Sequence, residues 1–460
     1  MKNSPGGPPS DRMTFSLMAQ STCINGPAGM SPIIREWSTN GTTSASSSRK
    51  APSILRRSAI REVDVAVVGG GPAGTATALA LARLGCAAIV IERTYYDTVR
   101  IGETLPPKIR LLLAKLGVWE EFLSQNHHRS FATHSAWGQA ELYANDFIFN
   151  PYGIGWHVDR LRFDMALARA AENAGVQVLR GAQLISIQEG PSNEWHIEVG
   201  VEGKQLEWYA KFLVDATGRA STIARKQGAI RVSWDHLIAV VAFFACDSRG
   251  STSINATLVE AVENGWWYSA MLPDGQVVVA FMTDADIYAR ASKNSDYVWN
   301  EQLQRTEYTK ARLCAGVRTS VQKIVSANSS CLDRTAGKNW LAVGDAAMAF
   351  DPLSSQGVYK ALETGFQAAE AVRHRLSGDA EAFPKYAAQL EENFDRYLAL
   401  RRYYYGRERR WPDSLFWKRR HAARIAYQGN LATELRTSRD RVRSHLAAFI
   451  KTPNRDVTAT

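Results

Sequence analysis

The sequence predicts an α/β fold with a Rossmann-like lobe, a second lobe built on a β-sheet, and a helical C-terminal extension. Three observations predict it. An apolar strand near the N-terminus runs into a glycine-rich turn and a helix of small residues, which is how a Rossmann unit begins. Several short apolar runs later in the chain predict the sheet of the second lobe. A strongly basic stretch with helical character follows them.

Residues 63–92 contain the most informative motif. An apolar strand leads into Gly69-x-Gly71-x-x-Gly74, and a helix of small residues, a second apolar strand and Glu92 follow. This order, within about 30 residues, is the dinucleotide-binding pattern. Gly69 is expected to permit the turn, Gly71 to let backbone amides approach a pyrophosphate, and Gly74 to let the helix pack on the strand. The helix N-terminus favours phosphates. Glu92 stands where a carboxylate accepts hydrogen bonds from a ribose.

Two later segments extend the first lobe. One apolar strand ends in Asp215-x-x-Gly218, and another ends in Gly344-Asp345 and is followed by a loop and a helix over residues 358–376. Parallel strands that end in glycine and aspartate are typical of an edge that binds a nucleotide cofactor.

With residues 155–164 (GWHVDRLRFD) between the first turn and these strands, residues 60–380 resemble the FAD-dependent monooxygenases of the p-hydroxybenzoate hydroxylase superfamily. That superfamily includes flavin halogenases and geranylgeranyl-reductase-like enzymes. The resemblance implies an FAD-binding lobe of the GR2 type, FAD held without a covalent bond, and a substrate sheet that lies over the flavin. It also implies reduction of the flavin by NAD(P)H or by a separately reduced flavin.

The resemblance further implies which residues contact FAD. Asp345 should bind the ribityl chain, although a helix N-cap is an alternative role for it. The amides after Pro352 should face the flavin pyrimidine, and a helix N-terminus at Gly357 would stabilise negative charge on reduced flavin. The full set of expected FAD contacts is Gly69, Gly71, Ala73, Gly74, Glu92, Arg93, Arg100, Arg160, Asp215, Gly218, Gly344, Asp345, Pro352, Gly357 and Val358.

No strong acid–base pair stands out in the sequence. Glu103, on the GET loop, and His157, in the GWHVDR segment, are the polar catalytic candidates, and Pro352 completes the expected catalytic set. Each has an ordinary alternative role. His157 could be a hydrogen-bonded core histidine, Glu103 could bond backbone in a turn, and Arg160 could form a surface salt bridge.

Composition excludes several classes of protein. No apolar stretch reaches the roughly 18 residues that a membrane helix needs. The 5 cysteines are scattered and odd in number, with neither metal-site nor disulfide spacing. This pattern favours a reducing, cytoplasmic compartment and argues against a structural metal site.

We expect the second lobe to be a sheet of four main strands, with a hairpin turn at residues 273–275 and one helix over residues 298–314. Trp266, Trp267 and Tyr268 would lie on this sheet, where packing is the more common role of aromatic side chains and substrate contact the alternative. The expected regions are 61–230 and 331–378 for FAD binding, 231–330 for the substrate sheet, 379–460 for the basic extension, and 1–60 for a tail that is disordered, a start codon placed too early, or a transit peptide.

Much of the net charge of +10 comes from the C-terminal extension. Between residues 396 and 424, arginines alternate with tyrosines and tryptophans, and only Glu408 and Asp413 offset them. The stretch could be a helix packed by its aromatic face or a docking surface for a polypeptide. Nucleic-acid binding is disfavoured, because no nucleic-acid module accompanies the charge.

Residues 100–107 (RIGETLPP) resemble the GES/GET-LPP loop of flavin halogenases. Those enzymes carry a lysine on the following segment, whereas no lysine occurs between Lys115 and Lys204. Their W-x-W-x-I-P motif is also absent. Residues 344–365 are instead most similar to the LodB-type branch, whose members hydroxylate a tryptophan of a partner polypeptide during the biogenesis of tryptophylquinone cofactors.

We therefore expect an FAD-dependent monooxygenase that hydroxylates an aromatic ring, with a tryptophan of a polypeptide partner as the substrate. A flavin-dependent halogenase and a small-molecule aromatic hydroxylase are the enzymatic alternatives. A non-catalytic FAD-binding chaperone is the alternative from another class.

Overall fold

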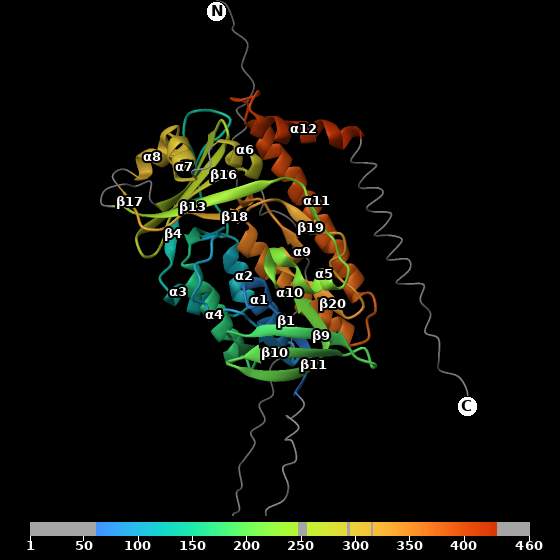
Figure 1. Ribbon diagram of the computed structural model, residues 1–460. Coiled ribbons are helices and arrows are strands. Elements are labelled where there is room, and N and C mark those ends of the chain that lie inside the picture. The colour runs from blue at the N-terminus through green and yellow to red at the C-terminus, as the bar shows by residue number, and fades with distance from the viewer. Residues whose placement is uncertain (1–60, 247–254, 292–294, 314–315, 430–460) are drawn as a thin grey trace, which may run out of the picture.

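The structure, a computed structural model, describes residues 61–246, 255–291, 295–313 and 316–429, with side chains as far as residue 422. Two lobes lie one above the other, and helix α11 runs beside both (Figure 1). The tail predicted for residues 1–60 lies outside the described part. Among the described helices, none has the length and apolar character that crossing a lipid bilayer requires.

The described part of the chain contains both helices and strands, and several strands follow one another without a helix between them. The helices are α1 (Pro72–Arg83), α2 (Ile109–Lys115), α3 (Trp119–Ser124), α4 (Arg160–Asn173), α5 (Thr222–Lys226), α6 (Ala285–Ala291), α7 (Ser295–Gln304), α8 (Tyr308–Leu313), α9 (Gly344–Ala347), α10 (Gly357–Leu376), α11 (Ala382–Arg407) and α12 (Leu415–Gly429), with 3-10 turns η2 (Gly218–Ala220) and η4 (Pro352–Ser354). The strands are β1 (Arg61–Val68), β2 (Ala88–Ile91), β3 (Thr104–Leu105), β4 (His128–Ser130), β5 (Ala132–Ala136), β6 (Tyr143–Asp146), β7 (Gly155–His157), β8 (Gln177–Leu179), β9 (Gln183–Glu189), β10 (Trp195–Val201), β11 (Lys204–Asp215), β12 (Arg231–Ser233), β13 (Leu237–Ala245), β14 (Ala256–Val262), β15 (Gly265–Met271), β16 (Gln276–Asp284), β17 (Val317–Arg318), β18 (Lys323–Ser326), β19 (Ser330–Leu332), β20 (Trp340–Ala342) and β21 (Met348–Ala349).

The first sheet is parallel through its centre, in the order β8-β2-β1-β11-β10-β9, with β20 beside the end of β11. Residues 65–68 of β1 and all of β2 are buried, as expected for parallel strands covered on both faces. The carboxyl ends of four strands meet at one edge, because Val68 pairs with Ile91 and Asp215, and Asp215 pairs with Ala342. Ligands of such sheets bind at that edge.

Helices α1 and α10 cross closely beside this edge. A Cβ on Gly365 of α10 would overlap the carbonyl oxygen of Ala73 in α1, and a Cβ on Gly344 would come within 2.7 Å of the Ala73 side chain. A Cβ on Gly74 would overlap the carbonyl oxygen of Gly69. The lack of side chains at these glycines therefore brings the turn after β1 against the segment after β20.

The second sheet has the order β17-β13-β16-β15-β14-β5-β6, with β18 beside β13. The predicted turn at residues 273–275 joins β15 to β16, and Gly275, at φ +83°, donates to the carbonyl of Leu272 at 3.0 Å. The predicted range of this lobe, 231–330, was too narrow. Residues 132–146 extend the sheet, because β5 pairs in parallel with β14, and pairing between strands so far apart in the chain leaves no local signal. The α/β fold with two lobes and C-terminal helices is confirmed.

The single helix predicted over residues 298–314 is two helices, α7 and α8. The carboxylate of Glu260, on β14, accepts the backbone N–H groups of Glu307, Tyr308 and Thr309 at 2.6, 3.2 and 2.7 Å. A carboxylate there satisfies the free amides of a first helical turn and complements its dipole. A new helix therefore begins at Tyr308.

The aromatic residues of β15 pack inside the protein. Trp266 and Trp267 have no solvent-exposed surface and lie on opposite faces of the sheet, as alternation along a strand requires. The indole N–H of Trp266 donates to the hydroxyl of Tyr405, on α11, at 3.0 Å. The ring of Trp267 stacks on Phe281 with 4.9 Å between centroids. Both tryptophans thus take the packing role.

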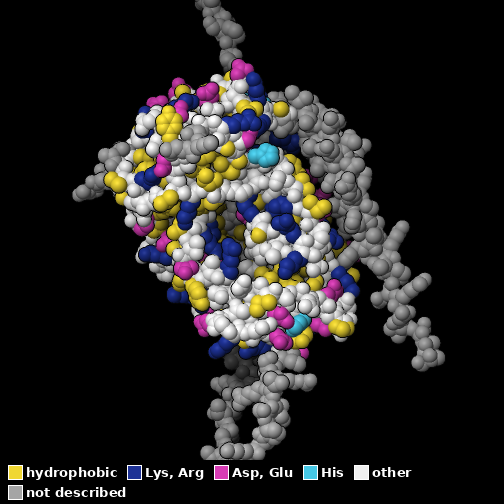
Figure 2. All heavy atoms as spheres, in the orientation of Figure 1, with side chains coloured by type: hydrophobic (Ala, Val, Ile, Leu, Met, Phe, Trp, Pro, Cys, Tyr) yellow, Lys and Arg dark blue, Asp and Glu magenta, His cyan; other side chains and the backbone are white. Residues whose placement is uncertain are grey.

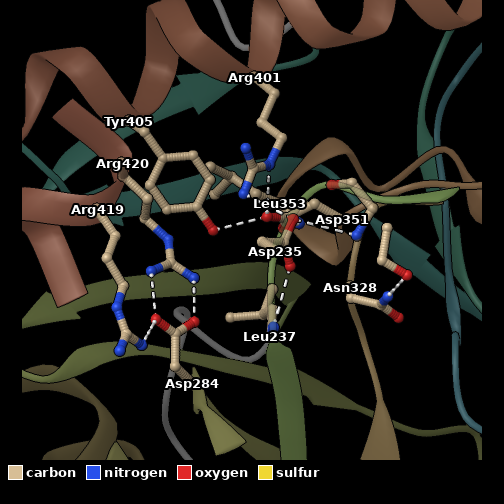
Figure 3. Close-up of polar contacts among 12 residues, drawn as sticks. Asp235, Leu237, Asp284, Asn328, Asp351, Leu353, Arg401, Tyr405, Arg419 and Arg420 are labelled. Carbon is tan, nitrogen blue, oxygen red and sulfur yellow. Dashed lines mark hydrogen bonds and ion pairs between the residues drawn. The ribbon is translucent and has the colours of Figure 1, made fainter. Parts of the chain in front are cut away.

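The basic C-terminal extension is anchored in the core. Arg401 is 8% exposed and forms ion pairs with Asp235 at 2.9 Å and Asp351 at 3.3 Å. Figure 3 shows Arg401 pointing from α11 toward these carboxylates, and Arg420 from α12 pointing toward Asp284, which it binds at 2.8 Å. As far as residue 422, the extension matches the packed-helix alternative, and these arginines are not a docking surface.

The buried position of Arg401 gives a test of this assignment. Arg401→Met should lower the free energy of unfolding by about 3 kcal/mol, because it leaves Asp235 and Asp351 buried without their common cation. Arg409→Met, a change at an exposed position beyond the C-terminus of α11, should change it by less than about 0.5 kcal/mol. Chemical denaturation monitored by circular dichroism measures both. If Arg401→Met lowered the free energy of unfolding no more than Arg409→Met does, the Arg401 ion pairs would contribute nothing to stability.

Candidate active site

The three glycines of the first turn have different structural roles. Gly69 has φ +107°, and a Cβ there would overlap the carbonyl of Ala216, so no other residue fits. Gly74 is held against the Gly69 carbonyl. Gly71 has an ordinary φ of −72°, and a Cβ there would meet only the end of the Arg100 side chain, 3.2 Å away. The fold therefore does not need glycine at Gly71, and the space in front of it is available to a ligand.

Glu92 lies at the end of β2 and closes the turn from behind. Its carboxylate accepts the N–H of Gly70 at 2.6 Å and the hydroxyl of Thr94 at 2.6 Å, and Arg100 pairs with it at 3.2 Å. The hydroxyl of Tyr96 donates to the carbonyl of Gly70 at 2.8 Å. The backbone N–H of Thr94 also donates to Glu92, at 3.0 Å, so local donors occupy the roughly four acceptor positions of the carboxylate. The contact of Glu92 to a ribose hydroxyl stays a prediction. Its neighbour Arg93 is exposed.

Asp215, one of the predicted FAD contacts, is held by local donors. It has no exposed surface, and its oxygens accept from Thr217 N–H at 3.0 Å, Thr217 hydroxyl at 2.7 Å and Ala224 N–H at 2.8 Å. These local hydrogen bonds shape the turn after β11, and the FAD contact of Asp215 stays a prediction. Gly218 follows it in the left-handed region, at φ +66°.

Asp345 lies at the same edge, and its side chain is 37% exposed. One oxygen pairs with the buried ammonium of Lys360 at 2.6 Å, and the other is 3.7 Å from Arg219. Burial by itself would raise the pKa of Asp345, but Lys360, Arg219 and Arg231 hold it below the usual value. Asp345 is thus an ionised acceptor at the surface of the edge, and it does not cap α9 or α10.

The loop that begins at Pro352 is braced from behind. Asp351 is 1% exposed; it accepts the hydroxyl of Tyr405 at 2.7 Å, and its backbone N–H donates to the hydroxyl of Tyr397 at 2.7 Å. Figure 3 shows Tyr405 pointing from α11 to Asp351. The loop leads to the exposed Gly357, where α10 begins, and to the buried Val358. The helix N-terminus is therefore presented where the flavin pyrimidine was expected.

Positive side chains gather around this edge. Figure 2 shows lysine and arginine side chains around a hollow between the two lobes. The close approach of Arg100 to Gly71 adds a cation to a helix N-terminus that already favours anions. The glycine turn, Arg100 and the partly exposed carboxylate of Asp345 therefore form a surface with the charges and acceptors that a pyrophosphate and a polyol chain need.

A pocket that is partly open to solvent adjoins this edge. It lies between the loop that follows Glu103, the second sheet and the loop after Pro352. Thr133, Asn145 and Thr257 supply polar groups from the sheet. Its mixed lining, mostly apolar with a few polar groups, is that of a site for a small molecule or a side chain. Its apolar walls include Leu105, Pro106, Pro107, Val259, Leu353 and Tyr359.

Glu103 is buried beside this pocket, with 3% exposure. Within the described chain, neither of its carboxylate oxygens has a hydrogen-bond partner. Burial raises the pKa of Glu103 above its usual value, outweighing the local backbone amides and the charge of Arg160. Glu103 is therefore a carboxyl group poised to hold a proton, which fits its predicted place among the catalytic residues.

Arg160 does not face the open edge. It forms a bidentate pair with Asp164 at 3.1 and 3.0 Å and donates to the carbonyl of Ile101 at 2.8 Å. Arg160 thereby holds the loop that carries Glu103. The alternative role considered for Arg160 was a surface salt bridge, but its pair with Asp164 is buried, because the Arg160 side chain is only 9% exposed.

His157 takes the core-histidine alternative. It has no exposed surface; its Nδ1 lies 3.0 Å from the carbonyl oxygen of Met271, and its Nε2 lies 2.9 Å from the hydroxyl of Thr257. Because a carbonyl only accepts, Nδ1 carries the proton and Nε2 accepts. Burial lowers the pKa of His157 to about 3, so the ring stays neutral. It acts by orienting Thr257 in the pocket wall.

Several site residues could not be identified from the sequence. Lys360 lies in a helix whose pattern is amphipathic, and nothing local shows that its ammonium is buried. Tyr268 donates to or accepts from Thr104 at 2.7 Å, a contact between distant segments. Asn145, 7% exposed, has an amide nitrogen without a partner among the described atoms. Only the fold brings these groups to one place.

Comparisons with known proteins agree with this geometry. Residues 62–384 match the family described as FAD binding domain. The FAD-dependent oxidoreductase LodB of Marinomonas mediterranea is 31% identical over 364 residues, which cover 78% of this chain and 97% of LodB. The predicted family and the FAD cofactor are thereby confirmed.

Solved structures share the fold. The chondrochloren halogenase CndH superposes with a TM-score of 0.73 at 24% identity, over 81% of this chain and 90% of that one. The peptidyl tryptophan dihydroxylase QhpG, essential for tryptophylquinone cofactor biogenesis, superposes with a TM-score of 0.64 at 25% identity, over 78% of each chain. One architecture thus supports halogenation in one relative and hydroxylation in another.

The different roles of the glycines can be separated by mutation. Gly71→Val should leave the fold intact and abolish FAD retention, because its side chain would occupy the space of the pyrophosphate while meeting only Arg100 in the protein. Gly74→Val should instead prevent folding. Absorbance of bound flavin, with circular dichroism as the control for folding, measures both. Stoichiometric FAD on Gly71→Val would contradict this placement of the cofactor.

Proposed function

Because the chain belongs to the FAD-binding-domain family and is an FAD-dependent oxidoreductase related to LodB, we propose that it is a monooxygenase that hydroxylates a tryptophan side chain within a partner polypeptide. The observation that carries the proposal is the pocket between the GET loop and the second sheet, whose mouth is bordered by large apolar side chains exposed to solvent. The relation to LodB and QhpG supports it.

The apolar border of the pocket suits a macromolecular substrate. Phe147 and Asn150 line the pocket, and between them Ile148 is 80% exposed and Phe149 93% exposed. Phe131, 46% exposed, adjoins them, because its carbonyl accepts the N–H of Phe147 at 2.8 Å. Exposed apolar patches next to a site mark surfaces that bind a partner. A polypeptide could cover this rim while one of its side chains enters the pocket.

The residues of the pocket would position the ring and handle protons. Bound FAD supplies the activation of oxygen. Leu105, Val259 and Leu353 exclude water from the ring, and the partner-free amide of Asn145 offers a donor to an acceptor oxygen of the substrate. Glu103, whose pKa burial raises, lies next to Thr104 of the pocket wall and would supply or accept a proton there. These groups orient, exclude water and exchange protons.

Halogenation remains the second candidate, because one lysine does reach the pocket. Lys108, on the loop itself, lines the pocket with its ammonium 5.5 Å from the centre of the Tyr359 ring. Residues 130–138 correspond to the segment on which halogenases carry their lysine, and here that segment contributes Thr133 to the pocket wall. An ammonium held by an aromatic ring is a possible carrier of an oxidised halide, so bromide belongs in the assay.

The reaction can be identified by isotope labelling. With reduced FAD, labelled oxygen and a set of tryptophan-containing peptides, we expect labelled oxygen on the tryptophan ring and no brominated product when bromide is added. Tandem mass spectrometry locates the label. Faster labelling of free tryptophan or a phenol would exclude the polypeptide substrate but retain the monooxygenase, whereas a brominated product that disappears in Lys108→Met would establish the halogenase alternative.

The exposed apolar side chains at the mouth of the pocket should contribute to binding of the polypeptide and not to the chemical step. Ile148→Ser with Phe149→Ser should raise the KM for a polypeptide substrate about 10-fold or more, since two exposed large side chains contribute roughly 1.5 kcal/mol or more each when covered. The kcat and the flavin spectrum should stay unchanged. Val321→Ser, at an exposed apolar position outside the pocket lining, is the matched control. An unchanged KM would place the partner elsewhere.

A further inference from the structure

The buried lysine of α10 is the feature that the proposed reaction does not use. Lys360 is 2% exposed and lies in the second turn of the helix that begins at Gly357. Its ammonium donates to Asp345 at 2.6 Å and also to the carbonyl of Met348, and it lies 4.8 Å from the centre of the Phe350 ring. Burying an ammonium is costly unless it is paired, so this position needs an explanation.

We propose that Lys360 is a positioning residue for FAD: it holds Asp345 in one orientation, ionised, with one oxygen turned to the cofactor. The proposal rests on Asp345 as the contact to the ribityl hydroxyls, and it does not depend on which substrate the enzyme oxidises.

The contacts of Asp345 leave it little freedom. Lys360 occupies Oδ1 from the protein side, and the guanidinium of Arg219 is 3.7 Å from Oδ2. Arg231 donates to the backbone carbonyl of Asp345 at 2.7 Å. The side chain is still 37% exposed, so the surface that remains lies on the side away from Lys360. A carboxylate held in this way needs no reorganisation when it accepts hydroxyl groups.

The charge balance depends on Lys360. The charged groups that act on Asp345 are Lys360 from α10, Arg219 from η2 and Arg231 from β12, with Arg160 of α4 coupled to it more weakly. Lys360 makes the one short hydrogen bond among their side-chain contacts to the carboxylate within the described chain. Without it, burial would favour the protonated acid. A protonated Asp345 would have lost acceptor capacity for the ribityl chain.

The test measures FAD binding alone, without substrate. Apo-protein is titrated with FAD at pH 8, 7, 6 and 5, and flavin fluorescence reports the dissociation constant. Lys360→Met should weaken binding about 10-fold or more, the effect of losing an ordered hydrogen bond to a charged group. The loss should grow as the pH falls, because the carboxyl then gains a proton nearer to neutral pH. Lys385→Met, at an exposed lysine of α11, is the matched control and should bind as wild type does.

A double-mutant cycle separates positioning from general stability. Asp345→Asn should weaken FAD binding, and adding Lys360→Met to it should change the dissociation constant by less than about 3-fold, because Lys360 then has no carboxylate to orient. The double variant removes both charges and remains informative if Lys360→Met alone does not fold. Additive losses, a pH profile of Lys360→Met parallel to that of wild type, or wild-type affinity in the double variant would each overturn the proposal. If the wild-type protein did not hydroxylate polypeptides but the FAD-binding cycle gave the expected result, only the proposed function would be refuted.

Discussion

The close crossing of α1 and α10 is the constraint on which the site depends. Gly344 and Gly365 admit no side chain at the crossing, because Ala73 occupies the space on the other side. The crossing brings the N-terminus of α1, with its free amides, beside the segment that carries Asp345. If either glycine were larger, the pyrophosphate surface and the ribityl acceptor would separate. The buried hydroxyl of Thr364 accepts a hydrogen bond from the backbone N–H of Gly344 at 2.9 Å and secures the same contact.

The C-terminal helices serve this site from a distance. Their aromatic side chains pack on the second sheet, where Trp137 donates to the carbonyl of Tyr404 at 2.8 Å and Trp417 to that of Val262 at 3.0 Å. Through Tyr405 and Arg401 they hold Asp351, immediately before the flavin loop. Two of the positive charges of this stretch, Arg401 and Arg420, therefore lie inside the protein. Buried ion pairs of this kind specify geometry more than they add stability.

The pocket combines a hydrophobic enclosure with unsatisfied polar groups. Glu103 and the amide of Asn145 are both buried, and within the described residues both lack partners. Buried polar groups without partners are costly and are expected where a ligand completes them. His157, in contrast, is satisfied at both nitrogens. The polar groups of the pocket that are free to bind a ligand are therefore those without hydrogen-bond partners among the described residues.

The sequence by itself determined the parts of the site that depend on short-range pattern. The Gly69–Gly74 turn, the acid at the end of β2 and the Gly344-Asp345 segment each need only a few neighbouring residues, so the lobe and its FAD cofactor followed from them. Tertiary structure alone decided which charges are buried. Arg401 and Lys360 resemble any other basic residue of an amphipathic helix. The partners that bury their charges lie on other elements: Asp235 is 166 residues from Arg401, and Asp345 lies on α9, whereas Lys360 lies on α10. Local periodicity carries no record of those partners, whereas turns and strand ends are built from adjacent residues.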